Sequence, residues 1–304
     1  MKLVFLTDFD GTVAQTFQSP PGGVGVIEAY ELAIESVFGS DGLALYHQQG
    51  GLAMRAPGET VSLLLAANAR LSDRARQWHE KGGWKLFDSL VPEGLGATVD
   101  WENESSKAAA ECLVVCKLNT LVRQIGTAVD STVWPALCAG FGTFWPWLHN
   151  WSEENGLGLV AGVITSGHHT FVEETFVLHT LLRPVLLVTN DHTRAQPWSR
   201  QSRLNKPHPE LFDLVNQVWL SEGADRQPLP AERTMFAGDD DRSDIGLAKG
   251  IGALPLHFVP GTQWVTFCDD RVVFGDWRRL ATWLERRTTR LQDGVPITDL
   301  AGAP

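Results

Sequence analysis

Short apolar runs alternate with longer segments of mixed polarity from residue 134 to near the end of the chain. Each run is rich in Val, Leu and Phe and stops at polar or glycine residues, which is typical of strands buried on both faces of a sheet. The predicted strands are Leu3–Leu6, Leu159–Ile164, Val185–Val188, Thr234–Ala237 and Ala253–Phe258. The expected helices are Phe141–Trp151, a segment ending near Leu182, one starting at Pro209, Ser243–Lys249 and Trp277–Arg287. This alternation predicts an α/β fold with a doubly wound parallel sheet.

The first half of the chain has a different hydrophobic pattern, which begins after a link rich in glycine and proline at Ser19–Gly23. Apolar residues there recur at helical spacing, and little in the block has the alternation of a strand. Ser105 is a predicted cap of a long helix through Val129. We therefore expect a mainly α-helical domain at 17–134, inserted into a core made of 1–16 and 135–304.

Composition and charge describe a globular, acidic protein. Of the 304 residues, 43% are hydrophobic and 20% are charged, a balance that argues against a disordered chain. The formal net charge of −11 argues against nucleic acid as a partner, because a phosphate backbone needs a basic surface. No apolar run approaches the ~20 residues of a membrane span, and no signal peptide precedes the first acids. Because we expect the four cysteines to be reduced thiols, we predict a cytoplasmic protein.

Two carboxylates one residue apart follow the first predicted strand, in Asp8-Phe9-Asp10-Gly11-Thr12. Side chains alternate along a strand, so Asp8 and Asp10 are expected on the same side where the strand ends. In open α/β sheets, ligands bind outside the carboxyl ends of the strands. Two acids held there repel each other unless a cation or a shared proton relieves them, and a divalent metal is the simplest relief. For an isolated pair, an acidic turn without function is the alternative.

Reactive polar groups also follow other predicted strands. Thr165 ends one apolar run, Asp239 follows another, and Lys206 lies at the mouth of a strand-to-helix connection. Taken alone, such a threonine is usually a helix cap, and such a lysine is usually a solvated surface group. Their order and their shared position at strand ends indicate a single site at one edge of the sheet.

With these motifs in this order, the chain resembles the haloacid dehalogenase superfamily. The resemblance rests on Asp-Phe-Asp-Gly-Thr at 8–12, Thr165 at the end of a strand, Lys206 within Lys-Pro-His-Pro-Glu-Leu-Phe, and Gly-Asp-Asp-Asp-Arg-Ser-Asp at 238–244. The Lys-Pro-x-Pro pattern is similar to the subgroup that includes phosphoglycolate phosphatase and β-phosphoglucomutase. The resemblance implies a Rossmann-like catalytic core with an inserted helical cap. Here the helical block is longer than usual and matches no cap sequence.

The resemblance also implies phosphoryl transfer through an aspartyl-phosphate. Asp8 would attack phosphorus as the nucleophile, while Asp10 would give a proton to the leaving oxygen and later take one from water. A bound Mg²⁺, which prefers oxygen ligands and keeps several waters, would complete the site. The implied metal residues are Asp8, Asp239 and Asp10 through its main-chain carbonyl, with Asp244 or Asp240 anchoring metal-bound water.

The remaining candidates would hold the substrate. Thr165 and the N–H groups of Ser166 and Gly167 would bind phosphate oxygens at a helix N-terminus. Lys206 would offset the charge of the nucleophile and the transferring group. Arg55, in a glycine-rich bend of the helical block, is a candidate for gripping the leaving group, and an ordinary surface arginine is an equal alternative. For His168 and His169, which follow the Thr165 turn, a structural role is favoured over a functional one.

We therefore expect a Mg²⁺-dependent phosphatase that acts on a small phosphorylated metabolite. Dehalogenating relatives lack a proton donor two residues after the nucleophile, so Asp10 favours phosphate chemistry over carbon–halogen cleavage. A phosphosugar mutase that uses the same aspartyl-phosphate is the nearest alternative. A binding module that keeps the fold and has lost turnover is a further one.

Overall fold

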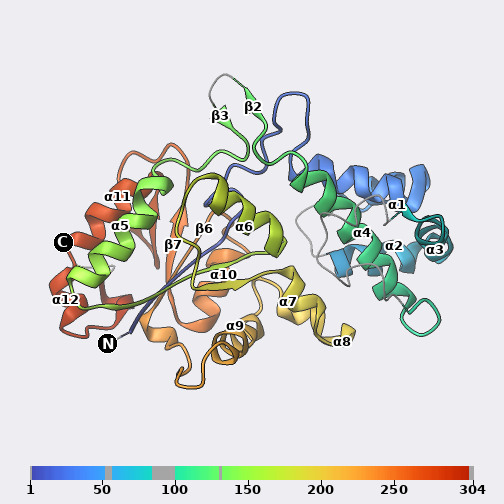
Figure 1. Cartoon of the computed structure of the whole chain (residues 1–304). Helices are drawn as coiled ribbons and strands as arrows, with labels where there is room; N and C mark the ends of the chain where they lie inside the picture. Colours follow the sequence, from blue (N-terminus) through green and yellow to red (C-terminus); the bar gives the residue numbers. More distant parts are fainter. Residues whose placement is uncertain (1, 52–56, 84–99, 130–131, 301–304) are drawn as a thin grey trace. The chain divides into compact units, whose positions relative to one another are not determined.

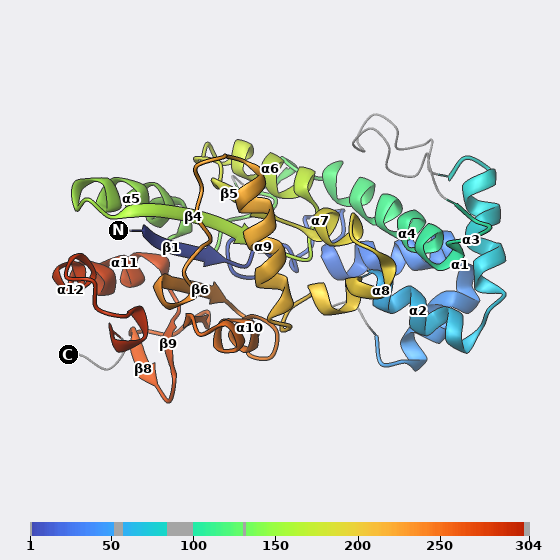
Figure 2. The same ribbon diagram turned by 90° about the horizontal axis from the view of Figure 1, so that it is seen from below.

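The computed structural model describes residues 2–51, 57–83, 100–129 and 132–300. A seven-stranded sheet forms the centre of one unit, in the strand order β5-β4-β1-β6-β7-β9-β8 (Figures 1 and 2). Neighbouring strands are parallel except for the antiparallel pair β8 and β9. The strands are β1 (Lys2–Thr7), β4 (Gly158–Ile164), β5 (Leu186–Val188), β6 (Thr234–Gly238), β7 (Leu254–Phe258), β8 (Thr266–Cys268) and β9 (Arg271–Phe274). The predicted α/β class with a mostly parallel sheet is confirmed.

Helices cover both faces of this sheet, because successive residues of the central strand β1 point to opposite sides. Val4 and Leu6 belong to an apolar cluster with α9 (Glu210–Ser221) and α10 (Asp244–Ile251). Phe5 points the other way and contacts Phe144 and Trp277, with ring centroids 5.4 and 6.2 Å away. These two aromatic residues belong to α5 (Phe141–Glu154) and α11 (Trp277–Glu285). The apolar strand residues are thus removed from water on both faces, which explains their continuous runs in the sequence.

The chain divides into two compact units. The unit with the sheet comprises 1–15, 136–196 and 203–304, and the second comprises 16–135 and 197–202. The remaining helices of the sheet unit are α6 (His169–Leu178), α7 (Asn190–Arg194) and α12 (Thr288–Gln292). The helix expected to end near Leu182 is α6, which ends earlier because the chain leaves helical geometry at Thr180, where φ is +54°.

The second unit is mainly helical. Its helices are α1 (Val26–Gln48), α2 (Pro57–Ala67), α3 (Leu71–Glu80), α4 (Ser105–Val122) and the short α8 (Trp198–Gln201). They enclose an apolar core with Tyr30, Phe38 and Leu113 at its centre. A small antiparallel ribbon, β2 (Ala128–Val129) and β3 (Thr132–Val133), belongs to the same unit.

The long helix expected from Ser105 to Val129 ends at Val122 instead. Gly126 adopts a φ of +82°, and its N–H donates to the Trp134 carbonyl over 2.9 Å, so the chain turns into the ribbon there. Ser105 is the first helical residue, and Glu104 occupies the cap position. Periodicity alone did not reveal this end, because apolar residues continue past it.

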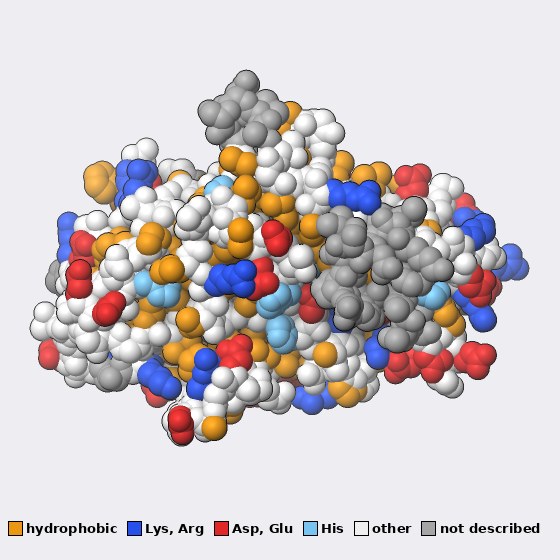
Figure 3. All heavy atoms as spheres, in the orientation of Figure 1, with side chains coloured by type: hydrophobic (Ala, Val, Ile, Leu, Met, Phe, Trp, Pro, Cys, Tyr) orange, Lys and Arg blue, Asp and Glu red, His pale blue; other side chains and the backbone are white. Residues whose placement is uncertain are grey.

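No helix in the described part of the chain has the length and apolar character that crossing a membrane requires. On the face drawn in Figure 3, acidic and basic side chains are interspersed with each other and with apolar groups.

Candidate active site

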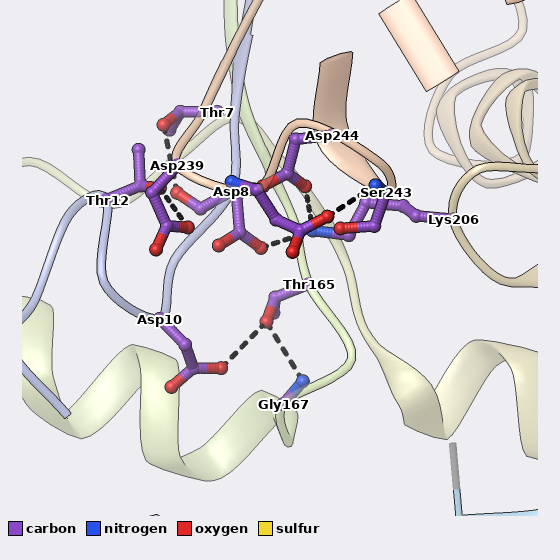
Figure 4. A network of polar contacts seen from close by, with 11 residues as sticks. Thr7, Asp8, Asp10, Thr12, Thr165, Gly167, Lys206, Asp239, Ser243 and Asp244 are labelled. Carbon is purple, nitrogen blue, oxygen red and sulfur yellow. Dashed lines mark hydrogen bonds and ion pairs between the residues drawn. The ribbon is translucent and has the colours of Figure 1, made fainter. Parts of the chain in front are cut away.

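Three polar side chains stand where neighbouring strands end (Figure 4). Asp8 follows β1 directly, Thr165 follows β4, and Asp239 follows β6. Since β1 lies between β4 and β6, these residues meet at the same edge of the sheet. The Asp8 N–H donates to the Ala237 carbonyl over 2.7 Å, which extends the pairing of β1 with β6 to the nucleophile candidate itself.

A cluster of three carboxylates forms at this edge. Asp8, Asp239 and Asp244 each offer a carboxylate oxygen, and these oxygens all lie within 4.8 Å of one another. Asp8 is 5% exposed and Asp244 is 1% exposed. Asp244 is the first residue of α10, and Gly238 allows its close approach: a Cβ at position 238 would lie 2.2–2.4 Å from the Asp244 side chain.

Lys206 reaches this cluster from the connection that precedes α9. Its Nζ donates to Asp8 and, over 2.5 Å, to Asp244, and its side chain is 10% exposed. Burial disfavours the ammonium form, yet the pKa of Lys206 is raised because the two carboxylates outweigh burial. Lys206 is therefore a fixed cation that holds the Asp8 carboxylate in place.

The cluster has an excess of negative charge when all three acids are ionised. Burial is the largest cause that raises the pKa of Asp8, and Lys206 opposes it only in part. Burial and then Asp244 raise the pKa of Asp239 to about 6. Three carboxylates against one ammonium are a set of hard oxygen donors that a divalent cation would relieve, and such donors fit Mg²⁺.

Asp10 takes part in a second polar group beside this cluster. The Thr165 hydroxyl donates to Asp10 Oδ2 over 3.3 Å and accepts from the Gly167 N–H over 2.9 Å. Figure 4 shows the Asp10 carboxyl turned toward Thr165, whereas the Asp8 carboxyl is turned toward Lys206. The two acids of the Asp-x-Asp pair thus have different partners, as a nucleophile and a separate proton donor require.

The other predicted residues lie as follows. Asp240 accepts from the Ser243 N–H over 2.5 Å, and its own N–H donates to Asp244 Oδ2, so it stabilises the turn into α10. Ser166 is exposed and Gly167 is buried. Arg55 lies outside the described residues.

Two polar neighbours of the cluster have no role that the sequence pattern predicts. Thr12 donates to Asp239 Oδ1 over 3.1 Å, and Trp277 Nε1 donates to the Thr12 carbonyl over 3.0 Å. His257 Nε2 lies 3.1 Å from the Asp239 carbonyl oxygen. Thr12 stands inside the Asp-Phe-Asp-Gly-Thr motif, which was its only signal. Nothing in the sequence around His257 indicated its position.

Comparisons with known proteins complete the description. The sequence matches no protein-family model and no curated protein. The structure is similar to a 2-haloacid dehalogenase from Pseudomonas syringae pv. Tomato DC3000, with 16% identity, 94% of this chain and 99% of that chain covered, and a TM-score of 0.44. It is also similar to a HAD phosphatase from Thermococcus onnurineus (17% identity, 93% and 98% covered, TM-score 0.38). A third similar structure is CbbY from Rhodobacter sphaeroides in complex with phosphate (18% identity, 92% and 96% covered, TM-score 0.43). In each of the three, the similarity extends over more than nine tenths of both chains.

Proposed function

We propose that this chain is a Mg²⁺-dependent phosphatase of the haloacid dehalogenase type that acts on a small phosphorylated metabolite. The observation that carries the proposal is the meeting of Asp8, Asp239 and Asp244 around the Lys206 ammonium, with Asp10 held apart by Thr165. A nucleophile, a hard-cation site and a separate acid are what hydrolysis through an aspartyl-phosphate requires.

Asp8 is the proposed nucleophile. Its carboxylate is nearly buried and is oriented by the hydrogen bond from Lys206, so one oxygen is held while the other can attack phosphorus. The positive charge of Lys206 also favours the ionised form that attack needs. The attack breaks the bond between phosphorus and the leaving oxygen and forms the bond from phosphorus to Asp8.

Asp8, Asp239 and Asp244 are the residues that would hold Mg²⁺. When bound, the ion would supply positive charge for the phosphoryl oxygens. Thr12 orients Asp239 through its hydroxyl, and Lys206 keeps Asp244 and Asp8 from repelling each other in the free site.

Asp10 is the proposed acid and base. The Thr165 hydroxyl donates to Oδ2 of Asp10 and so orients the carboxyl group to which we assign the proton transfer. Asp10 would protonate the leaving oxygen during attack and then take a proton from the water that hydrolyses the aspartyl-phosphate. After both steps Asp10 has regained its proton, Asp8 is free, and inorganic phosphate is released.

A phosphate-release screen tests this proposal. Sugar phosphates, nucleotides, phosphoglycolate and phosphorylated amino acids would be offered to the full chain with Mg²⁺ and with EDTA. We expect Mg²⁺-dependent release of phosphate from at least one substrate and none in EDTA. Activity that depends on a bisphosphorylated sugar would favour a mutase instead. Tight binding without release at saturating Mg²⁺ would favour a binding module.

Binding of Mg²⁺ should raise the melting temperature, and the increase should be larger at pH 7.5 than at pH 5. The folded pKa of Asp239 lies near 6 and its ordinary value is 3.8, so the metal-free fold loses stability as pH rises through this window. Above pH 6 the cation meets ionised ligands, whereas at pH 5 it must displace a proton. Thermal denaturation with and without Mg²⁺ at both pH values measures the difference.

The matched control for this prediction is Asp239→Asn, which removes one ligand and the titrating group together. We expect its response to Mg²⁺, and the difference in that response between the two pH values, to be smaller than in the wild type. An increase in the wild type that is equal at pH 5 and 7.5 would argue against a metal at Asp239.

A further inference from the structure

Residues 189–194, which follow β5 and include α7, hold the turn after Thr165 in place through hydrogen bonds. The Asn190 N–H donates to the Gly167 carbonyl over 3.0 Å. The His169 N–H donates to Asp191 Oδ2 over 2.8 Å. Since His169 is the first residue of α6 and its cap residue His168 makes no side-chain capping bond, Asp191 caps this helix from another segment.

Asp191 is itself held by several donors. Arg194 donates to its Oδ1 over 2.7 Å, the Thr189 hydroxyl donates to its Oδ2 over 3.4 Å, and His168 Nδ1 lies 3.6 Å from Oδ1. Burial by itself raises the pKa of Asp191, but these donors outweigh it and hold the pKa well below the usual range. Asp191 is therefore a fixed carboxylate whose charge is offset by Arg194.

The turn that Asp191 holds is the one expected to bind phosphate. Thr165 accepts from the Gly167 N–H, while the Ser166 N–H donates to none of the described residues and is available to a ligand. Backbone N–H groups bind an anion only while the turn keeps them aimed at one point. The bond from Asn190 holds Gly167 through its carbonyl, and the bond to Asp191 holds His169 through its N–H, so the turn is fixed on the C-terminal side of Ser166.

We propose that Asp191 is a positioning residue for phosphate: it caps α6 from outside and so fixes the 165–168 turn, in which the Ser166 N–H is available to the anion. The inference rests on the proposed function and deepens it. Asp191 acts through the turn and not by touching the phosphate, since a carboxylate would repel that anion. When the Asp191 carboxylate is removed, a positioning role predicts weaker phosphate binding, whereas a purely electrostatic role predicts tighter binding.

The experiment measures the dissociation constant of inorganic phosphate by calorimetry, on the full chain with saturating Mg²⁺. We expect Asp191→Ala to weaken phosphate binding about tenfold or more, in the range seen when an outer-shell partner is lost. Asp191→Asn keeps an oxygen that can accept from the His169 N–H, so it should bind nearly as tightly as the wild type. Asp276→Ala is the matched control. It removes the aspartate that caps α11 by accepting from the Arg278 N–H over 2.9 Å, and phosphate affinity should not change.

A second variant removes the same bond from the other side. His169→Pro deletes the donating N–H at the first position of a helix, where proline is well tolerated. It should weaken phosphate binding as Asp191→Ala does, whereas His169→Ala should not. These variants keep the test decisive if Asp191→Ala does not fold.

The outcomes are distinct. Unchanged affinity in Asp191→Ala and in His169→Pro would overturn the positioning role and leave the proposed function intact. Tighter binding in both Asp191→Ala and Asp191→Asn would also overturn it, because only the charge would then matter. Absence of phosphate binding by the wild type would overturn both the proposed phosphate turn and the role of Asp191.

Discussion

Replacing Asp8 with asparagine should lower the kcat of phosphate release by about 10⁴- to 10⁶-fold, the range found when a catalytic nucleophile is removed. The amide cannot form the acyl-phosphate at a useful rate, although it has nearly the same shape and still accepts from Lys206. Asp8 follows the strand β1, which lies between β4 and β6. Asp239, the clustered acid that follows the neighbouring strand β6, stands in a different place and does not substitute for Asp8. Steady-state kinetics at saturating Mg²⁺, with the substrate found in the screen, measures the loss.

The control for this variant is Asp241→Asn. Asp241 belongs to the same acidic run as Asp239 but is exposed and pairs with Arg271. Turnover of this variant should stay near the wild-type value, since Asp241 is exposed and is not one of the three clustered acids. Substantial turnover in Asp8→Asn, once mass spectrometry has excluded deamidation to aspartate, would refute the nucleophile assignment.

The fold class was predictable because the strands of a parallel sheet are buried on both faces. Five apolar runs predicted five strands, and each of their bounds lies within one residue of the observed bound. The pattern missed β8 and β9, which extend the edge of the sheet. Thr266–Cys268 is exposed along its whole length, so it has no apolar run to mark it. Edge strands of this kind are defined by pairing, which a single sequence does not display.

The meeting of Asp8 and Asp239 was predictable for a different reason. Polar residues at the carboxyl ends of adjacent parallel strands converge wherever the strands are neighbours. The hydrogen-bond partners of the individual site residues were not predictable from their spacing in the sequence. Asp10 pairs with Thr165, and Asp191 caps a helix that begins more than twenty residues earlier. Such partnerships depend on side-chain rotamers and on loops that only the folded chain brings together.

The second large effect is expected for Lys206→Met, in stability as well as in turnover. Methionine keeps the length of the side chain but leaves two buried carboxylates, Asp8 and Asp244, without their ammonium. Removal of one partner from a buried ionic group costs about 3–5 kcal/mol, whereas an exposed pair contributes at most about 1 kcal/mol. The control is therefore Lys249→Met, which breaks the more exposed pair with Asp270 at 2.7 Å. Urea unfolding of both variants in EDTA measures the two losses.

The dependence of this loss on pH identifies its cause. Without the ammonium, the pKa of Asp8 rises further above its unfolded value, so the folded state binds more protons than the unfolded state. Stability of Lys206→Met should therefore fall as pH rises from 5 to 8, more steeply than in the wild type. Adding Asp244→Asn to Lys206→Met should recover part of the stability at pH 8, because it removes one of the two repelling charges. A loss that is the same at both pH values and is unchanged in the double variant would mean that Lys206 contributes packing and not charge. That outcome would contradict the proposal that the Lys206 ammonium stabilises the Asp8 carboxylate.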